Sequence, residues 1–80
     1  MAARRRKEVD TSTYEGRFAA RLKELREKAK LTVEELAEKS GIPDKTLYSW
    51  EAATHMPTVV KLPELARALK VKIRNLLPES

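Results

Sequence analysis

The sequence contains no cysteine, one histidine, two glycines and four prolines among its 80 residues, and only 5% of its residues are aromatic. Without cysteine, no disulfide, thiolate metal site or thiol redox chemistry is available. The single histidine, His55, lacks partners at a catalytic or metal-binding spacing, and we interpret it as a loop residue. There is also no glycine-rich phosphate loop. The sequence therefore predicts neither an enzyme nor a protein with a cofactor or metal.

Long hydrophobic runs are missing as well. No segment approaches the roughly 20 consecutive apolar residues that a membrane-spanning helix needs, and the beginning of the chain lacks the apolar stretch of a signal peptide. We therefore expect a cytoplasmic protein without a membrane partner. The composition, 41% hydrophobic and 36% charged, is typical of one small globular domain with a modest core. The net charge of +5 favours a polyanionic partner such as nucleic acid.

The charge is spread unevenly along the chain. Residues 15–31 and residues 52–80 each have a net charge of +3, whereas residues 32–51 between them have a net charge of −3. Residues 1–14 have a net charge of +2 and include the basic run Arg4–Lys7. This first segment has almost no apolar side chains and no periodicity, which predicts a disordered tail. Its basic run is open to two interpretations, an arm along DNA or a solvated tail.

The acidic central segment, LTVEELAEKSGIPDKTLYSW, has the pattern of two short helices joined by a tight turn. Thr32 and Glu35 have the spacing of a capping box, which would begin the first helix. Ala37 is small enough for a second helix to cross nearby, and Gly41 four residues later accepts the positive φ of a helix end. Pro43 is acceptable in the first turn of the next helix. Together these features predict a helix-turn-helix.

Helical periodicity continues on both sides of this unit. A preceding helix is expected from Gly16, and the second helix of the pair from about Pro43 to Ala52. A fourth helix is expected after Thr58. Pro63 is open to two interpretations, a helix that begins at Leu62 with Pro63 at N1 or, as we favour, an irregular first turn. A last short helix would end before Pro78. The fold is therefore predicted to be all-α, a compact bundle of five helices around one core. The expected core residues are Phe18, Leu22, Leu25, Leu36, Ala37, Ile42, Leu47, Trp50, Leu62, Leu65, Leu69, Ile73 and Leu76.

From about Phe18 to Pro78 the chain resembles the phage-repressor and Cro-type (XRE-like) helix-turn-helix family. The segments that carry the resemblance are, in order, LKELREKAKLTVEELAEKSGI, TLYSWE, a proline, LPELARALKV and a final LL. The resemblance implies a lambda-repressor-like bundle over residues 15–80, with its third helix in the DNA major groove. It also implies a transcriptional regulator, a repressor or an antitoxin-like autoregulator, that binds double-stranded DNA at a palindromic operator as a homodimer.

Carried over by position, the resemblance assigns roles to individual residues of this chain. Helix N–H groups around Thr32 and Val33 would approach a phosphate. Arg26 and Glu51 would form a structural tie between the first and third helices, and Leu47 and Trp50 would belong to the core. The residues of the third helix expected at DNA bases or the backbone are Pro43, Asp44, Lys45, Thr46, Tyr48 and Ser49.

Three positions depart from the family pattern. Val33 replaces a common glutamine, Ala52-Ala53 replaces a small polar residue and a glycine, and Asp44 stands where a neutral or basic residue is usual. Asp44 is open to two interpretations, a favourable charge at the helix start or a reader of cytosine. The net charge of −3 over residues 32–51 also supports an alternative function, a protein-interaction module that uses this acidic face to bind a basic partner. A bound regulator would be associated with the nucleoid.

Overall fold

The computed structural model describes residues 10–78. The basic run Arg4–Lys7 lies outside these residues. Over 10–78 the chain forms α1 (Tyr14–Lys28), α2 (Val33–Ser40), α3 (Asp44–Glu51), a single 3-10 turn η1 (Val59–Lys61), α4 (Leu62–Leu69) and α5 (Ile73–Leu76), and no strand is present in this part of the chain. The all-α prediction with five helices is confirmed.

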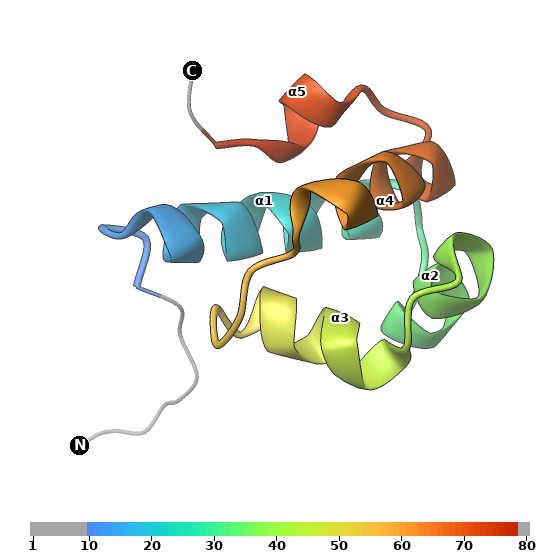
Figure 1. The fold of residues 1–80 in the computed structure, drawn as a ribbon, viewed down its shortest axis with the longest axis horizontal. Coiled ribbons are helices and arrows are strands. Elements are labelled where there is room, and N and C mark those ends of the chain that lie inside the picture. The colour runs from blue at the N-terminus through green and yellow to red at the C-terminus, as the bar shows by residue number, and fades with distance from the viewer. Residues whose placement is uncertain (1–9, 79–80) are drawn as a thin grey trace.

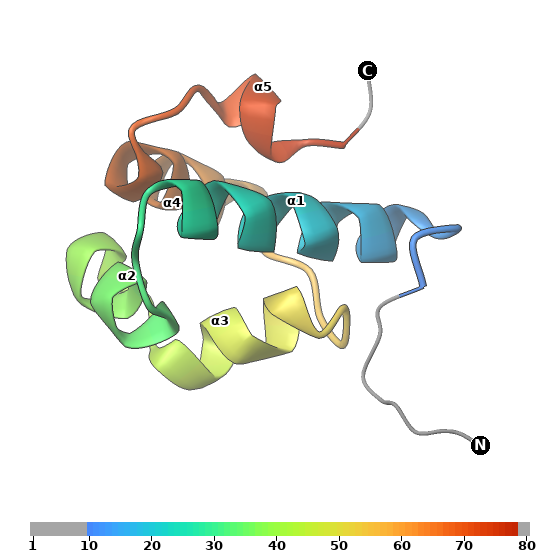
Figure 2. The same cartoon turned by 180° about the vertical axis from the view of Figure 1, so that it is seen from behind.

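Helix α1 is the longest element and lies in the middle of the bundle (Figure 1). Helix α3 packs against one side of α1 and α5 against the other, so α1 separates these two helices. Helix α2 contacts both α3 and α4. The view from behind shows α3 again at the edge of the molecule, with no other element outside it (Figure 2). This arrangement leaves the outer side of α3 open to solvent.

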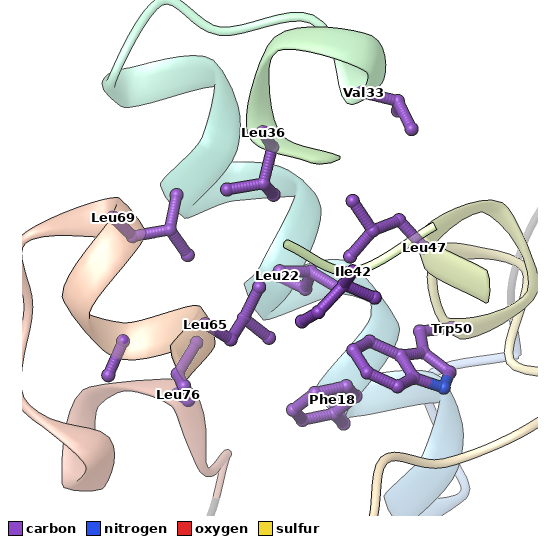
Figure 3. Close-up of a cluster of buried hydrophobic side chains, with 11 residues drawn as sticks. Phe18, Leu22, Val33, Leu36, Ile42, Leu47, Trp50, Leu65, Leu69 and Leu76 are labelled. Carbon is purple, nitrogen blue, oxygen red and sulfur yellow. The ribbon is translucent and has the colours of Figure 1, made fainter. Parts of the chain in front are cut away.

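A single apolar cluster joins all five helices (Figure 3). Its fully buried large side chains come from all five helices and from the turn between α2 and α3. They are Phe18, Leu22, Leu36, Ile42, Leu47, Leu65 and Leu76. Three expected core residues, Leu25, Ala37 and Leu62, are only partly buried at the margin of the cluster. The prediction for Ile73 is wrong, because its side chain is 39% exposed. Helix α5 has only one turn, so a single residue of it, Leu76, is buried.

The helix-turn-helix unit has the predicted local chemistry. The Thr32 hydroxyl accepts from the Glu35 N–H at 3.1 Å, and the Glu35 carboxylate accepts from the Thr32 N–H at 2.9 Å, which confirms the capping box. Gly41 ends α2 in the left-handed region with φ of 77°. The prediction for Pro43 is wrong by one position. Its ψ of 142° is extended, so it precedes the helix as N-cap, and Asp44 is the first helical residue.

Helix α1 begins two residues earlier than its pattern predicts. The Thr13 hydroxyl accepts from the Gly16 N–H at 2.9 Å, and this N-cap starts the helix at Tyr14. The preceding turn folds over the helix so closely that a Cβ on Gly16 would lie 1.8 Å from the Asp10 carbonyl oxygen. The predicted disordered segment 1–14 was therefore too long at its end, since residues 10–14 form this turn and the start of α1.

Two further turns lie after α3 and before α4. Ala53 follows α3 with φ of 62°, so the left-handed turn forms there although glycine is missing. The 3-10 turn η1 runs directly into α4, which begins at Leu62 with Pro63 in its first turn. The start of this helix therefore combines the two interpretations, an irregular turn followed by a regular helix from Leu62. Thr58 precedes η1, but its side chain makes no capping hydrogen bond.

Candidate nucleic-acid interface

Helix α3 has a buried side and a polar side. Leu47 and Trp50 are buried in the core, whereas the Lys45 side chain is exposed and Tyr48 is 50% exposed. The remaining polar residues of the helix are partly buried, namely Asp44, Thr46, Ser49 and Glu51. Because an α-helix has 3.6 residues per turn, the two apolar residues three positions apart share one side and leave the other to polar residues. Since α3 packs against α1 and buries Leu47 and Trp50, its polar side is the one not covered by the core.

Tyr48 is connected to the neighbouring helix. Its hydroxyl donates to the Glu34 carboxylate of α2 at 2.8 Å. This hydrogen bond lowers the pKa of Glu34 below its usual range, and it raises the pKa of Tyr48. Both groups are on the surface, so the bond orients the phenol without burying it. The hydrogen bond thus holds the Tyr48 side chain in one orientation on the outer side of α2 and α3.

The start and the middle of α3 have further local hydrogen bonds. The Ser49 hydroxyl donates to the Thr46 carbonyl oxygen at 2.7 Å. No side chain caps the start of the helix, and Asp44 is the acidic residue of its first turn. A carboxylate at this position is favoured by the positive end of the helix dipole. The position of Asp44 fits the interpretation as a favourable charge at the helix start. The interpretation as a reader of cytosine stays open, because the partly buried side chain lies on the helix proposed to meet the bases.

The side chains at the start of α2 are engaged within the protein. Thr32 is exposed, but its N–H and its hydroxyl are both engaged in the capping box with Glu35. The Val33 side chain is only 5% exposed and belongs to the core. Its apolar side chain therefore stabilises the fold, and any contact of Val33 with a phosphate would have to use its backbone N–H.

Arg26 and Glu51 form the predicted tie. The Arg26 Nε donates to Glu51 Oε2 at 2.6 Å and Nη2 donates to Oε1 at 3.0 Å, so the pair is bidentate. A third N–H, on Nη1, donates to the Leu31 carbonyl oxygen at 2.8 Å. The bond to Glu51 raises the pKa of Arg26, which remains cationic at all relevant pH values. The guanidinium thereby links the end of α3 to α1 and to the loop before α2.

A search of protein families agrees with this geometry. A helix-turn-helix family (HTH_3) matches residues 22–76, a range that begins in α1 and ends with α5. The chain belongs to this helix-turn-helix family. The match includes the capped helix α2, the glycine turn and the Arg26–Glu51 tie described above.

Relatives with known names or structures support the assignment. Over 60 residues this helix-turn-helix protein is 40% identical to the uncharacterized HTH-type transcriptional regulator YobD of Bacillus subtilis (strain 168), and the alignment covers 75% of the chain. It covers 54% of the relative, so the chain spans about half the length of that protein.

Two crystal structures have a similar fold. The restriction-modification controller protein C.AhdI from Aeromonas hydrophila has a TM-score of 0.74 and 33% identity, over 76% of this chain and 92% of that one. An HTH_3 family transcriptional regulator from Vibrio cholerae has a TM-score of 0.75 and 24% identity, over 79% of this chain and 35% of that one. The lambda-repressor-like architecture that the resemblance implied is therefore confirmed.

Other kinds of site find little support in the described part of the protein. Over residues 10–78, no three histidine or acidic side chains are grouped so that they could bind a metal ion. None of the helices in the same range is long and apolar enough to span a membrane.

Sequence reasoning missed the internal hydrogen bonds of this surface. Glu34 and Tyr48 are 14 residues apart and on different helices, so no spacing rule connects them. The bond from Ser49 to Thr46 was accessible in principle, because serine in a helix commonly donates to a carbonyl of the preceding turn.

Proposed function

We propose that this helix-turn-helix protein is a sequence-specific DNA-binding transcriptional regulator, a repressor or an antitoxin-like autoregulator. The observation that carries the proposal is α3, whose Lys45 and Tyr48 side chains project from a helix fixed by buried Leu47 and Trp50. A helix of this width fits the major groove of B-DNA. Family membership adds that other chains with this fold are named as transcriptional regulators.

In this proposal the base contacts come from α3 and most of the affinity comes from phosphate contacts. Residues 32–51 have a net charge of −3, so α2 and α3 alone would be repelled by DNA. The segments 15–31 and 52–80 each have a net charge of +3 and would supply the phosphate contacts. Backbone N–H groups at the start of α2, near Thr32 and Val33, would approach one phosphate. The positions proposed to contact DNA at the N-cap of α3 and along the helix are Pro43, Asp44, Lys45, Thr46, Tyr48 and Ser49.

A homodimer on a palindromic operator is the assembly that we propose. Two copies of α3 would then read half-sites about one turn of DNA apart. The surface proposed for the dimer contact lies around the last helix, residues 73–77. Ile73 there is 39% exposed, and an exposed apolar residue of this size is more stable when covered. The bound protein would be associated with the nucleoid.

Selection of bound duplexes from a random pool tests the proposal. We expect a palindromic consensus, because each half-site would meet the same helix. Titration with salt should show the logarithm of the binding constant falling linearly with the logarithm of the salt concentration. Absence of any enriched sequence, together with binding that does not respond to salt, would refute it.

Substitutions on α3 distinguish residues that contact bases from residues that stabilise the fold. Lys45→Ala should relax the base preference while leaving the thermal midpoint nearly unchanged, because the side chain is exposed. Leu47→Ala is the contrasting variant, because its side chain is fully buried and its truncation should cost about 2–5 kcal/mol of stability. A Lys45→Ala protein with an unaltered consensus would argue against the assigned role.

The acidic charge of α2 and α3 supports a second candidate function. The exposed carboxylates of Glu34 and Glu38 and the partly buried Asp44 would suit a basic protein partner. This interaction module would be favoured by a protein partner that co-purifies with the chain in a fixed ratio and binds more weakly to Glu38→Lys. The chain itself should then show no affinity for DNA.

A further inference from the structure

Two hydroxyl groups on the polar side of α3 have already used their protons inside the protein. Tyr48 donates to Glu34 at 2.8 Å, and Ser49 donates to the Thr46 carbonyl oxygen at 2.7 Å. A hydroxyl group has one proton to donate and two lone pairs that accept. With the proton engaged, each of these oxygens has only acceptor capacity left for a ligand.

The direction of both hydrogen bonds follows from chemistry. The carbonyl oxygen of Thr46 has no proton, so Ser49 is the donor. Between Tyr48 and Glu34, the pKa of the carboxyl is lowered and that of the phenol is raised by the same bond. Near neutral pH the carboxylate is therefore ionised and the phenol is protonated. The shared proton belongs to Tyr48.

Asp44 adds a third acceptor to this surface, because an ionised carboxylate accepts hydrogen bonds and donates none. Lys45 is the strong donor of the same helix, and its ammonium group suits a phosphate or a guanine. The side chains of α3 thus offer acceptors from Asp44, Tyr48 and Ser49 and a charged donor from Lys45, while the partly buried Thr46 hydroxyl can donate or accept. In the major groove the only hydrogen-bond donors of the bases are the N4 amino group of cytosine and the N6 amino group of adenine.

We propose that α3 recognises its operator through these exocyclic amino groups, which donate to Tyr48, Ser49 and Asp44. The inference rests on the DNA-binding function proposed above and specifies its chemistry. It assigns Glu34 the role of a positioning residue, which does not touch DNA but determines that the Tyr48 oxygen faces the groove as an acceptor. Acceptor atoms of the bases, such as purine N7, would not be read by Tyr48.

Modified bases test this prediction directly in the selected duplex. Replacing adenine by N6-methyladenine, or cytosine by N4-methylcytosine, puts a methyl group where the major-groove amino hydrogen was and keeps the base pair. Replacing a purine by its 7-deaza form removes the N7 acceptor instead. With the full chain, we expect the methylated base to weaken binding about three- to tenfold at one or more positions of each half-site. The 7-deaza purines should change affinity less than twofold at those positions.

Tyr48→Phe distinguishes a lost hydrogen bond from a steric clash with the methyl group. Phenylalanine keeps the ring and removes the oxygen. If Tyr48 accepts from an amino group, the variant binds the unmodified duplex more weakly and no longer responds to methylation at that position. A methyl group that simply clashes with the ring would weaken the variant as much as the parent protein, and this would overturn the assignment.

Glu34→Ala tests the positioning role, and Glu38→Ala is its matched control. Both variants remove one exposed carboxylate from α2, so both should bind DNA more tightly through reduced repulsion. Only Glu34→Ala frees the Tyr48 proton, so only this variant should become sensitive to a 7-deaza purine and less sensitive to amino methylation. An identical response of the two variants would refute the role of Glu34.

The outcomes separate the inference from the function on which it rests. Failure to select any sequence refutes both. A clear consensus whose affinity depends on purine N7 and not on amino groups refutes the inference alone, because Tyr48 would then be donating to DNA. A consensus that depends on amino groups, with loss of this dependence in Tyr48→Phe, supports both.

Discussion

Removing Arg26 should destabilise the protein more than removing any other single charge of α1. The side chain donates three hydrogen bonds, two to Glu51 and one to the Leu31 carbonyl oxygen. The two charged side chains are only 13% and 11% exposed, so water replaces few of the lost contacts. Arg26→Ala leaves a nearly buried carboxylate without its cation, and we expect it to lower the free energy of unfolding by about 3 kcal/mol.

A double-mutant cycle isolates the contribution of the pair. Glu51→Ala alone should cost a similar amount, because it leaves the guanidinium without its counterion. The double variant should cost less than the sum, with a coupling energy of about 2 kcal/mol, since neither charge is then left unpaired. Lys28→Ala is the control in the same turn of α1. Its side chain is exposed, so the expected loss is below about 1 kcal/mol.

Urea unfolding followed by circular dichroism measures these energies. With a slope of about 1 kcal/mol per molar urea, a loss of 3 kcal/mol moves the midpoint down by about 3 M. The slope itself should not change if the variants still unfold in one step. A coupling energy below about 0.5 kcal/mol, or equal losses for Arg26→Ala and Lys28→Ala, would show that the tie does not stabilise the fold as the distances imply.

Three further predictions concern the turns and the surface bond. Ala53→Gly should raise the free energy of unfolding by about 1 kcal/mol, because φ of 62° strains alanine, whereas Ala52→Gly, at φ of −91°, should give no gain in the same urea titration. Gly16→Ala should lower the melting temperature although alanine favours helices, because its Cβ would lie 1.8 Å from a carbonyl oxygen of the preceding turn. The hydrogen bond from Tyr48 lowers the pKa of Glu34, so this bond stabilises the fold fully above the unfolded-state pKa of Glu34 and less as the pH falls through the lower folded-state pKa. NMR titration should show that the pKa of the Glu34 carboxyl rises in Tyr48→Phe.

The local features of the helix-turn-helix could be predicted because they depend on near neighbours. The capping box at Thr32 and the positive φ of Gly41 follow from residues within four positions of each other. The pattern of apolar residues fixed which side of α3 is buried, and Leu47 and Trp50 are in the core as expected. The Arg26–Glu51 pair came from the family resemblance, because 25 residues separate its members.

The errors occurred where a residue's neighbours come from elsewhere in the chain. Pro43 is expected as the first helical residue, but its extended backbone places it before α3 as N-cap. Ile73 was expected in the core, but α5 is too short to cover it. Ala53 lacks the freedom of glycine and still adopts the left-handed turn, in a chain whose flanking helices are fixed by their packing.

Periodicity, turn residues and charge, all readable along the chain, determined that this protein is a bundle of five helices with a helix-turn-helix at its centre. Only the tertiary structure decided what the exposed groups of that unit can do. The proton of Tyr48 is directed to Glu34 because α2 and α3 pack side by side. A hydroxyl group can donate once, so a contact between distant residues, rather than the identity of Tyr48, engages the proton that the phenol would otherwise have free.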